Sequence, residues 1–368
     1  MTPDWVESLK AVPRALFLPT LMWAHDMTTG ESVPVSRTDD PDEWQRQAFT
    51  DVPIVTQWDD GEHEGTEPGS LSTSSASMPS VVTSMLRDLD VKPGLRVLEI
   101  GTGTGWNCAL LAHRLGSENV VSVEVDGAVA AQARTNLSRA GLHPDVIRGN
   151  GELGWQRDAP YNRIIATAGV RSVPPAWLAQ TRPGGVILAP WGTHYGNEDA
   201  LVRLTVNEDG SASGPFLRPV AFMKLRDQRL DWERFSDYVS AFPGDAIRST
   251  TRLTPNDLGS QYETARFVTG LVVPDLAHVV NQPDADTTNA WFFDLTSRSW
   301  AAVVFRTGEP FATAYQSGGR QLWDEVEQAL TWWAREGRPE LDQFGLTVLP
   351  DGEQRPWLGD PMNTIRTG

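Results

Sequence analysis

A glycine-rich turn is the feature of this sequence best suited to bind a small molecule. Val97–Ile100 reads as a short buried strand, and glycines alternate with threonines directly after it, over Gly101–Gly105. Glycine permits a tight turn and lets a ligand approach the backbone closely. The G-x-G-x-G spacing misses the dinucleotide fingerprint by one residue, and no Gly-Lys-Ser/Thr follows, which excludes an ATP P-loop. The turn predicts a nucleoside-type cofactor that need not carry phosphates.

An acid in the following strand narrows the choice of cofactor. Glu124 lies near the end of the predicted strand Asn119–Val125, about 25 residues after Glu99. An acid at that place can accept hydrogen bonds from both hydroxyls of an adenosine ribose. S-adenosylmethionine fits, because its sulfonium cation also favours an acidic site. The alternative is an acid that only caps the next helix, a place that Asp126 can also fill.

Two serines ahead of the glycine turn could hold a carboxylate. Ser75 and Ser77 precede Pro79, which suits the first turn of a helix with an apolar face formed by Val82, Met85, Leu86 and Leu89. A helix N-terminus carries partial positive charge and free N–H groups. By composition alone, a solvated serine-rich linker over Ser70–Ser80 is the better interpretation. Placement directly before the strand–glycine unit favours a carboxylate site over a linker for Ser77. For Ser75 the two interpretations are equally supported.

Alternating strands and helices must position these residues. Trp106–Leu115 is an apolar helix pattern that Gly116 stops, and a second helix runs from Asp126 to Gly141. Short strands follow at Asp145–Arg148, Asn162–Ala166 and Gly185–Ala189. This alternation predicts right-handed crossovers and a parallel sheet with helices on both faces.

The two flanks have different patterns. The first 75 or so residues read as irregular, with polar runs at Thr28–Glu43 and Asp59–Ser77 that look like surface loops or insertions. Beyond about residue 225 the pattern predicts paired strands, a helix and a closing hairpin, at Ala290–Leu295, Trp300–Phe305, Arg320–Glu336, Leu346–Leu349 and Arg355–Leu358. We therefore expect three parts: an N-terminal segment at 1–78, a cofactor-binding domain at 79–226 and an α+β domain at 227–368.

Composition excludes several classes of partner. The 368 residues carry a formal net charge of −17, which disfavours nucleic acid and anionic membranes. The single cysteine, Cys108, permits no intramolecular disulfide, and the histidines show no metal-ligand spacing. The N-terminus lacks the pattern of a signal peptide, so we expect a cytoplasmic protein without a metal site. Arg226, Arg229 and Arg234 could form a local basic patch for an anionic substrate.

Successive blocks of the sequence resemble the protein-L-isoaspartate O-methyltransferase family. These are VLEIGTGTGWNCALLA, VVSVEVD, PYNRIIATAGV and RPGGVILAPWG, preceded by VPRALFLP (Val12–Pro19) and AFTDVP (Ala48–Pro53). The resemblance covers about 12–226 and implies a Rossmann-like class I methyltransferase sheet, with S-adenosylmethionine as cofactor. WWAREG and FGLTVLPDG are similar to the C-terminal domain of enlarged members that accompany ribosomally made peptides such as lanthipeptides and graspetides.

The resemblance also implies a set of site residues. On the substrate side it implies Ser77, Ser75 and Asp51 as catalytic residues. On the cofactor side it implies Glu99, Gly101, Thr102, Gly103, Thr104, Gly105, Glu124, Val125, Gly149, Asn150, Gly151, Thr167 and Ala168. Thr102 and Thr104 either bond the cofactor or only shape the turn, and Asp51 is alternatively a turn residue before Pro53.

Two departures from the family pattern bear on these expectations. Asn150 stands where the family usually has an aspartate that contacts the adenine amino group, and its amide oxygen can still accept that bond. Met78 stands where the family often has glutamine, on the substrate side.

Three functions remain open. The first is esterification of a peptidyl aspartate, followed by cyclisation to aspartimide, with a peptide as partner that the 227–368 domain recognises. The second is repair of isoaspartate in damaged proteins. The third is a catalytically silent peptide-binding module, against which the intact glycine turn and Glu124 argue. The sequence does not predict the oligomeric state.

Overall fold

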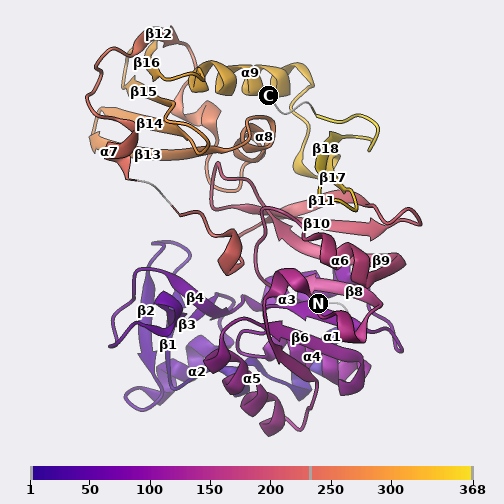
Figure 1. The fold of residues 1–368 in the computed structure, drawn as a ribbon. Helices are drawn as coiled ribbons and strands as arrows, with labels where there is room; N and C mark the ends of the chain where they lie inside the picture. The colour runs from indigo at the N-terminus through magenta and orange to yellow at the C-terminus, as the bar shows by residue number, and fades with distance from the viewer. Residues whose placement is uncertain (1–2, 232–233, 366–368) are drawn as a thin grey trace.

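A nine-stranded sheet forms the centre of the molecule. The computed structural model describes residues 3–231 and 234–365. The strand order is β18-β17-β11-β10-β9-β8-β5-β6-β7 (Figure 1). Its parallel part comprises β5 (Val97–Ile100), β6 (Val120–Glu124), β7 (Asp145–Arg148), β8 (Tyr161–Ala166) and β9 (Thr181–Trp191). The predicted parallel strands are confirmed, and the order reverses between β5 and β8, where such sheets bind ligands.

Helices cover both faces of this sheet, as the alternating pattern predicts. One face packs against α1 (Pro3–Ala11), α3 (Pro79–Leu89), α4 (Trp106–Leu115) and α5 (Gly127–Arg139). The other packs against α6 (Pro175–Gln180) and α8 (Thr264–Val272). The four apolar residues predicted for α3 are all buried, and Asp126 caps α5 by accepting from the backbone N–H groups of Ala128 and Val129. None of the helices within residues 3–231 and 234–365 is long and apolar enough to cross a membrane.

The N-terminal segment is more regular than the sequence predicts. It forms a four-stranded sheet, order β2-β1-β3-β4, from β1 (Leu21–His25), β2 (Ser32–Ser36), β3 (Ile54–Trp58) and β4 (Ser72–Ala76), with α2 (Pro41–Phe49) beside it. The prediction of irregular structure is therefore wrong for much of residues 21–76. These strands have only five residues each, and they become regular through pairing with one another, which no local periodicity reports.

The C-terminal part contains a five-stranded sheet of order β12-β16-β15-β14-β13, at the far end of the molecule from the N-terminal sheet (Figure 1). Its strands are β12 (Ile247–Thr251), β13 (Leu276–Asp284), β14 (Thr287–Asp294), β15 (Trp300–Arg306) and β16 (Ala312–Ser317). The helix α9 (Leu322–Arg335) packs on one face, and the short helix α7 (Phe235–Tyr238) precedes β12. The predicted pair of strands and the long helix are confirmed.

The closing hairpin returns to the central sheet. Strands β17 (Phe344–Val348) and β18 (Gln354–Leu358) pair with each other, and β17 pairs with β11 (Ala212–Val220), which lies beside β10 (Asp199–Val206). Side chains of β17 and α8 are buried in the same core as the parallel strands. The nine-stranded sheet therefore contains strands from both sides of the expected boundary at 226.

Candidate functional site

The carboxyl ends of the parallel strands bring the predicted cofactor residues together. The backbone N–H of Gly101, after β5, donates to the carbonyl of Val123 on β6 at 2.8 Å. The N–H of Gly149, after β7, donates to the carbonyl of Glu124 at 2.9 Å, and that of Thr167, after β8, donates to the carbonyl of Ile100 at 2.9 Å. The loops after β5, β7 and β8 thus meet at one edge with the end of β6, although their residues are far apart in the sequence.

The glycine turn adopts a backbone that only glycine accepts readily. Gly101, Gly103 and Gly105 have φ angles of 94°, 53° and 89°. A Cβ atom on Gly101 would lie 3.0 Å from Oγ1 of Thr167, and one on Gly103 would lie 3.4 Å from the carbonyl oxygen of Ser75. The turn therefore forms a narrow cradle. Thr167 borders it on one side, and strand β4, which carries Ser75, borders it on another.

Glu124 supports this turn from the neighbouring strand. Its carboxylate accepts from the backbone N–H of Gly103 at 2.9 Å and from that of Asp126 at 3.1 Å. Burial raises the pKa of Glu124, and these two hydrogen bonds counteract part of the rise. Each carboxylate oxygen has a second lone pair, so the group retains acceptor capacity for ribose hydroxyls. A cradle of small residues beside a buried acceptor fits an adenosine-type cofactor.

Glu99 lies beneath the turn instead of lining it. Its side chain is fully buried and accepts from the hydroxyl of Ser122 at 2.5 Å and from the amide of Asn107 at 2.6 Å. Burial raises the pKa of Glu99 to about 7. Because no part of Glu99 reaches solvent, the expectation of direct cofactor contact is corrected: the residue supports the turn from below.

The two threonines of the turn also point into the protein. The hydroxyl of Thr102 lies 2.6 Å from that of Ser122, so Thr102 belongs to the buried network of Glu99. The carbonyl of Thr104 accepts from the amide of Asn136 on α5 at 3.0 Å. Both threonines are buried, which favours the interpretation that they shape the turn.

The remaining predicted cofactor residues lie in the loops around the turn. The hydroxyl of Thr167 donates to the carbonyl of Gly101, and Ala168 lies against the same glycine. Val125 is exposed at the end of β6. The carbonyl of Gly151 accepts from the indole of Trp177 at 2.8 Å, which fixes the loop after β7.

Ser75 and Ser77 do not lie in a linker. Ser75 is within β4, and Ser77 lies between β4 and α3. The carbonyl of Ser77 accepts from the guanidinium of Arg14, which is buried and also donates to the carbonyls of Gln47, Ala48, Thr50 and Val52. Burial lowers the pKa of Arg14 to about 10. One buried side chain thus fixes the backbone of both substrate-side segments.

Asp51 has a clear structural role. Its carboxylate accepts from the backbone N–H of Ser80 at 2.8 Å, so it caps α3. The expectation that the start of α3 offers free N–H groups is corrected in part, because Pro79 has none and Ser80 already bonds Asp51. Asp51 and Ser77 nevertheless lie at the same helix end.

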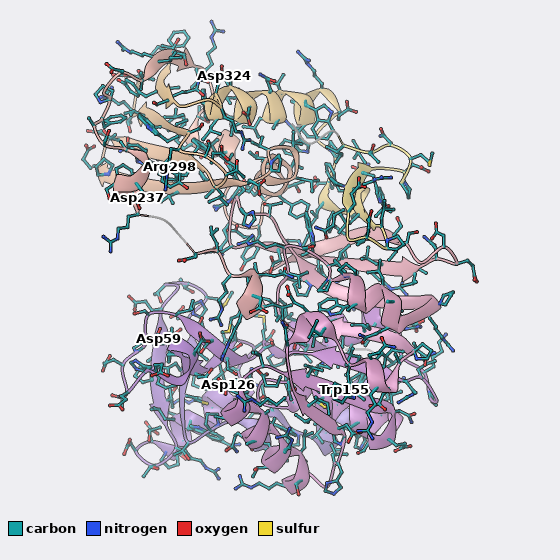
Figure 2. All side chains as sticks on the ribbon, viewed as in Figure 1. Asp59, Asp126, Trp155, Asp237, Arg298 and Asp324 are labelled. Carbon is teal, nitrogen blue, oxygen red and sulfur yellow. The ribbon has the colours of Figure 1, made fainter. Side chains whose placement is uncertain are left out.

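A short segment crosses the edge of the site; we call residues 225–229 the strap. Arg226 pairs with Asp60 at 3.0 Å and with Asp126 at 2.8 Å, and Arg229 pairs with Asp60 at 2.8 Å. Asp126 lies among the side chains at this edge (Figure 2). Although burial alone would raise the pKa of Asp126, backbone hydrogen bonds such as that from Val129 and the bond from Arg226 lower it to about 2.

These ion pairs involve two of the three arginines suggested for a basic patch. Arg226 and Arg229 are engaged by carboxylates, so they do not offer free charge to an anionic substrate. The strap is fastened further by Gln228, which donates to the carboxylate of Glu152 at 2.7 Å and accepts from the N–H of Arg171 at 2.6 Å.

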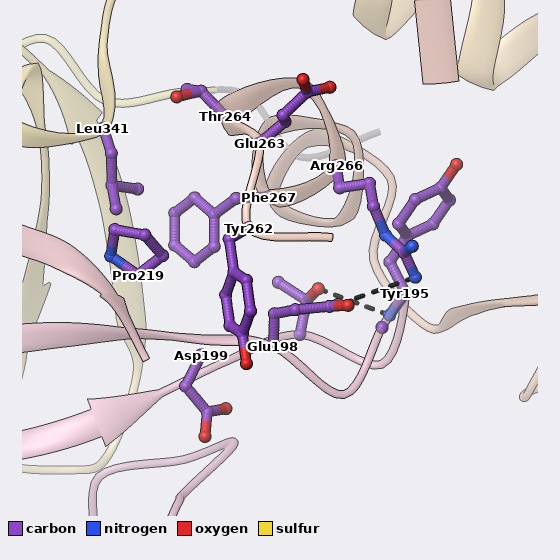
Figure 3. Close-up of a pocket in the computed structure, with 12 residues that line it drawn as sticks. Tyr195, Glu198, Asp199, Pro219, Tyr262, Glu263, Thr264, Arg266, Phe267 and Leu341 are labelled. Carbon is purple, nitrogen blue, oxygen red and sulfur yellow. Dashed lines mark hydrogen bonds and ion pairs between the residues drawn. The ribbon is translucent and has the colours of Figure 1, made fainter. Parts of the chain in front are cut away.

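A separate pocket lies away from the glycine turn. It is lined by Pro219, Tyr262, Phe267 and Leu341 on apolar sides and by Glu198, Asp199 and Arg266 on polar ones (Figure 3). Its cavity volume is about 20 Å³, room for a single water molecule and far too small for a nucleoside. Buried Asp199 is paired there with Lys224 at 2.8 Å.

Sequence reasoning missed the residues that support the site. Arg14 lies within the VPRALFLP block, so its motif was visible, but its five carbonyl partners are not encoded locally. Asn107, Ser122 and Asp60 gave no signal, because each acts through a partner that only folding brings close.

Comparisons with known proteins agree with this geometry. The family model described as Protein-L-isoaspartate(D-aspartate) O-methyltransferase matches residues 34–230. A Protein-L-isoaspartate O-methyltransferase from Pyrococcus horikoshii is 39% identical over 150 residues, covering 40% of this chain and 67% of the relative. One from Rhodospirillum rubrum is 34% identical over 184 residues, covering 50% of this chain and 81% of the relative.

The fold likeness extends further along the chain than the family match. A solved structure titled protein-L-isoaspartate O-methyltransferase aligns with 98% of this chain and 96% of its own, with a TM-score of 0.55 and 21% identity. The C-terminal part therefore has a counterpart in that fold. The chain belongs to the protein-L-isoaspartate O-methyltransferase family and is an S-adenosylmethionine-dependent protein carboxyl O-methyltransferase.

Proposed function

We propose that this enzyme methylates the side chain of a normal aspartate in a ribosomally made, macrocyclic peptide, and that the ester cyclises to aspartimide. The observation that carries the proposal is the covered site edge. Asp60, from the loop between β3 and β4, ties down the strap through Arg226 and Arg229. A repair enzyme must accept isoaspartate in many sequence contexts, whereas we infer that an edge fixed by these ion pairs suits one dedicated peptide.

Met78 supports the same choice. It precedes α3 beside Ser77, and its side chain offers no capping hydrogen bond to that helix. An apolar side chain in place of the glutamine that the family often has removes a polar contact on the substrate side. The C-terminal part does not help to decide, because a solved structure titled protein-L-isoaspartate O-methyltransferase aligns over nearly the whole chain.

The chemistry requires positioning more than proton transfer. An aspartate side chain has an ordinary pKa near 3.9 and is ionised at neutral pH, so no base is needed. The cofactor supplies an electrophilic methyl group. Ser77 would donate to one carboxylate oxygen and so aim the other, while Arg14 and Asp51 hold the surrounding backbone.

The proposed product follows from the ester. The backbone N–H that follows the aspartate loses its proton and attacks the ester carbonyl, and methanol leaves as the ring closes. Esterification adds a methylene and methanol departs, so the net change is a loss of roughly 18 Da, the mass of water.

The experiment compares two substrates with the full-length enzyme and cofactor. One is a short isoaspartyl peptide and the other is a candidate precursor peptide encoded beside the enzyme's gene, tested linear and macrocyclised. Mass spectrometry should show the net loss of water from the precursor and little change in the isoaspartyl peptide. Rapid methylation of the isoaspartyl peptide, with none of the precursor, would leave isoaspartate repair as the function.

A pair of variants tests the substrate side. Ser77→Ala should lower turnover about tenfold with little change in cofactor affinity, because its hydroxyl is proposed to contact only the substrate. Ser84→Ala is the matched control, since Ser84 lies on α3 and its hydroxyl donates to the carbonyl of Val81 at 2.9 Å. Equal activity of the two variants would remove Ser77 from the site.

A further inference from the structure

Three neighbouring strands indicate how the cofactor would lie. The glycine turn follows β5, Glu124 ends β6, and Asn150 follows β7. If Glu124 receives the ribose hydroxyls, the methionine end extends over the glycine turn and the base extends the other way, toward Asn150. An adenine amino group is a donor, so it requires an acceptor on Asn150.

The contacts of Asn150 settle which way its amide faces. Its Oδ1 accepts from the backbone N–H of Glu152 at 2.9 Å, and its Nδ2 donates to the carboxylate of Asp227 at 2.7 Å. Rotating the amide by half a turn would place Nδ2 against an N–H donor and Oδ1 against a carboxylate, and both contacts would be lost. The oxygen is therefore held in one place, with a lone pair to spare.

Asp227 comes from the strap, which links the cofactor-binding part to the C-terminal part. Two ion pairs of Arg226, one of Arg229 and the bonds of Gln228 surround it. Asp227 itself is exposed. Its carboxylate reaches the Asn150 amide because the strap crosses over the loop after β7.

We propose that Asp227 is a positioning residue for the cofactor: it orients the Asn150 amide so that the oxygen accepts from the adenine amino group. Asn150 and Asp227 form a complementary pair, and a carboxylate at 150 would face a second carboxylate in the strap. This rests on the cofactor site of the proposed function and not on the identity of the methylated peptide.

A reciprocal exchange tests the pair by calorimetry with S-adenosylhomocysteine. N150D should weaken binding by roughly fivefold at low salt, because two carboxylates then face each other. D227A should weaken binding by about threefold, the scale of one exposed hydrogen bond. The double variant N150D/D227N should bind within about twofold of wild type, since the amide now donates in the opposite direction.

Salt and a control separate orientation from a general structural effect. One molar salt should erase most of the N150D defect, because it screens the repulsion between exposed carboxylates. Asp231→Asn removes one exposed acid just after the strap and should leave affinity unchanged. Melting temperatures verify that every variant folds. A double variant no better than N150D, or a D227A variant with wild-type affinity, would overturn the proposal, whichever peptide the enzyme methylates.

Discussion

Glu124 combines two roles at the scale of a single residue, since it holds the glycine turn and faces the proposed ribose site. Glu124→Ala should raise the dissociation constant of S-adenosylmethionine by about tenfold or more, because charged hydrogen bonds are each worth about 1.5–3 kcal/mol. Calorimetry measures the change. Glu124→Gln keeps the shape of the side chain but loses one acceptor. The affinity of this variant for the cofactor should therefore lie between those of wild type and Glu124→Ala. Wild-type affinity in the alanine variant would place the ribose elsewhere.

Glu99 should make stability depend on pH. Its folded pKa, raised by burial to about 7, exceeds the ordinary value of 4.5. Between these two pH values the folded state retains a proton that the unfolded state has released. The free energy of unfolding should therefore fall as pH rises from about 4.5 to about 7.

The matched variant for this effect is Glu99→Gln, which keeps the side-chain shape without the charge. Relative to wild type, this variant should gain stability as the pH rises from 5 to 8, by up to roughly 3 kcal/mol. Urea unfolding at several pH values measures the difference. Parallel stability curves for the two proteins would contradict the burial of an ionisable group at this place.

The contacts of the strap depend on charge. Asp60 accepts both Arg226 and Arg229, and its φ of 54° is one that asparagine also tolerates. Asp60→Asn should loosen the strap with the backbone conformation retained. Partly exposed ion pairs are worth about 0.5–1 kcal/mol, so amide hydrogen exchange in 225–229 should accelerate by a few-fold.

Hydrogen exchange followed by mass spectrometry tests this change. Exchange in β5 and β6 serves as the internal reference, because these strands are buried at the centre of the sheet. The wild-type strap should also exchange faster in high salt, whereas that of the Asp60→Asn variant should respond less. Unchanged exchange at 225–229 would mean that the contacts with Asp126, Asn150 and Glu152 hold the strap without Asp60.

For the whole molecule, the shared central sheet determines how far the chain can be shortened. Strand β17 covers the edge of β11, and Phe344, Leu346 and Val348 are fully buried in the central core. A fragment ending at 226 would expose that edge and lose these side chains, each worth roughly 1.5–3 kcal/mol on burial. We expect the fragment to melt at least about 10 °C lower or to aggregate.

Circular dichroism and size-exclusion chromatography check this expectation. In the full-length chain, Leu346→Ala provides a milder test, which should cost about 2–5 kcal/mol. A fragment with the melting temperature and cofactor affinity of the full chain would show that the cofactor-binding part is independent after all.

The sequence alone was sufficient for the parallel strands, the glycine turn and the place of Glu124. These features depend on neighbours within a few residues: apolar runs of strand length, glycines that permit positive φ, and a helix cap at Asp126. For the same reason the long helix α9 and the closing hairpin were predicted from spacing and turn residues.

Tertiary structure decided what these features contact. The N-terminal strands, the burial of Glu99, the capping of α3 by Asp51 and the five bonds of Arg14 all join segments distant in the sequence. The arginines of the strap read as free charge until folding places Asp60 and Asp126 beside them. Residue type and spacing report local conformation, whereas pairing, burial and charge compensation depend on partners that only the folded chain brings within reach.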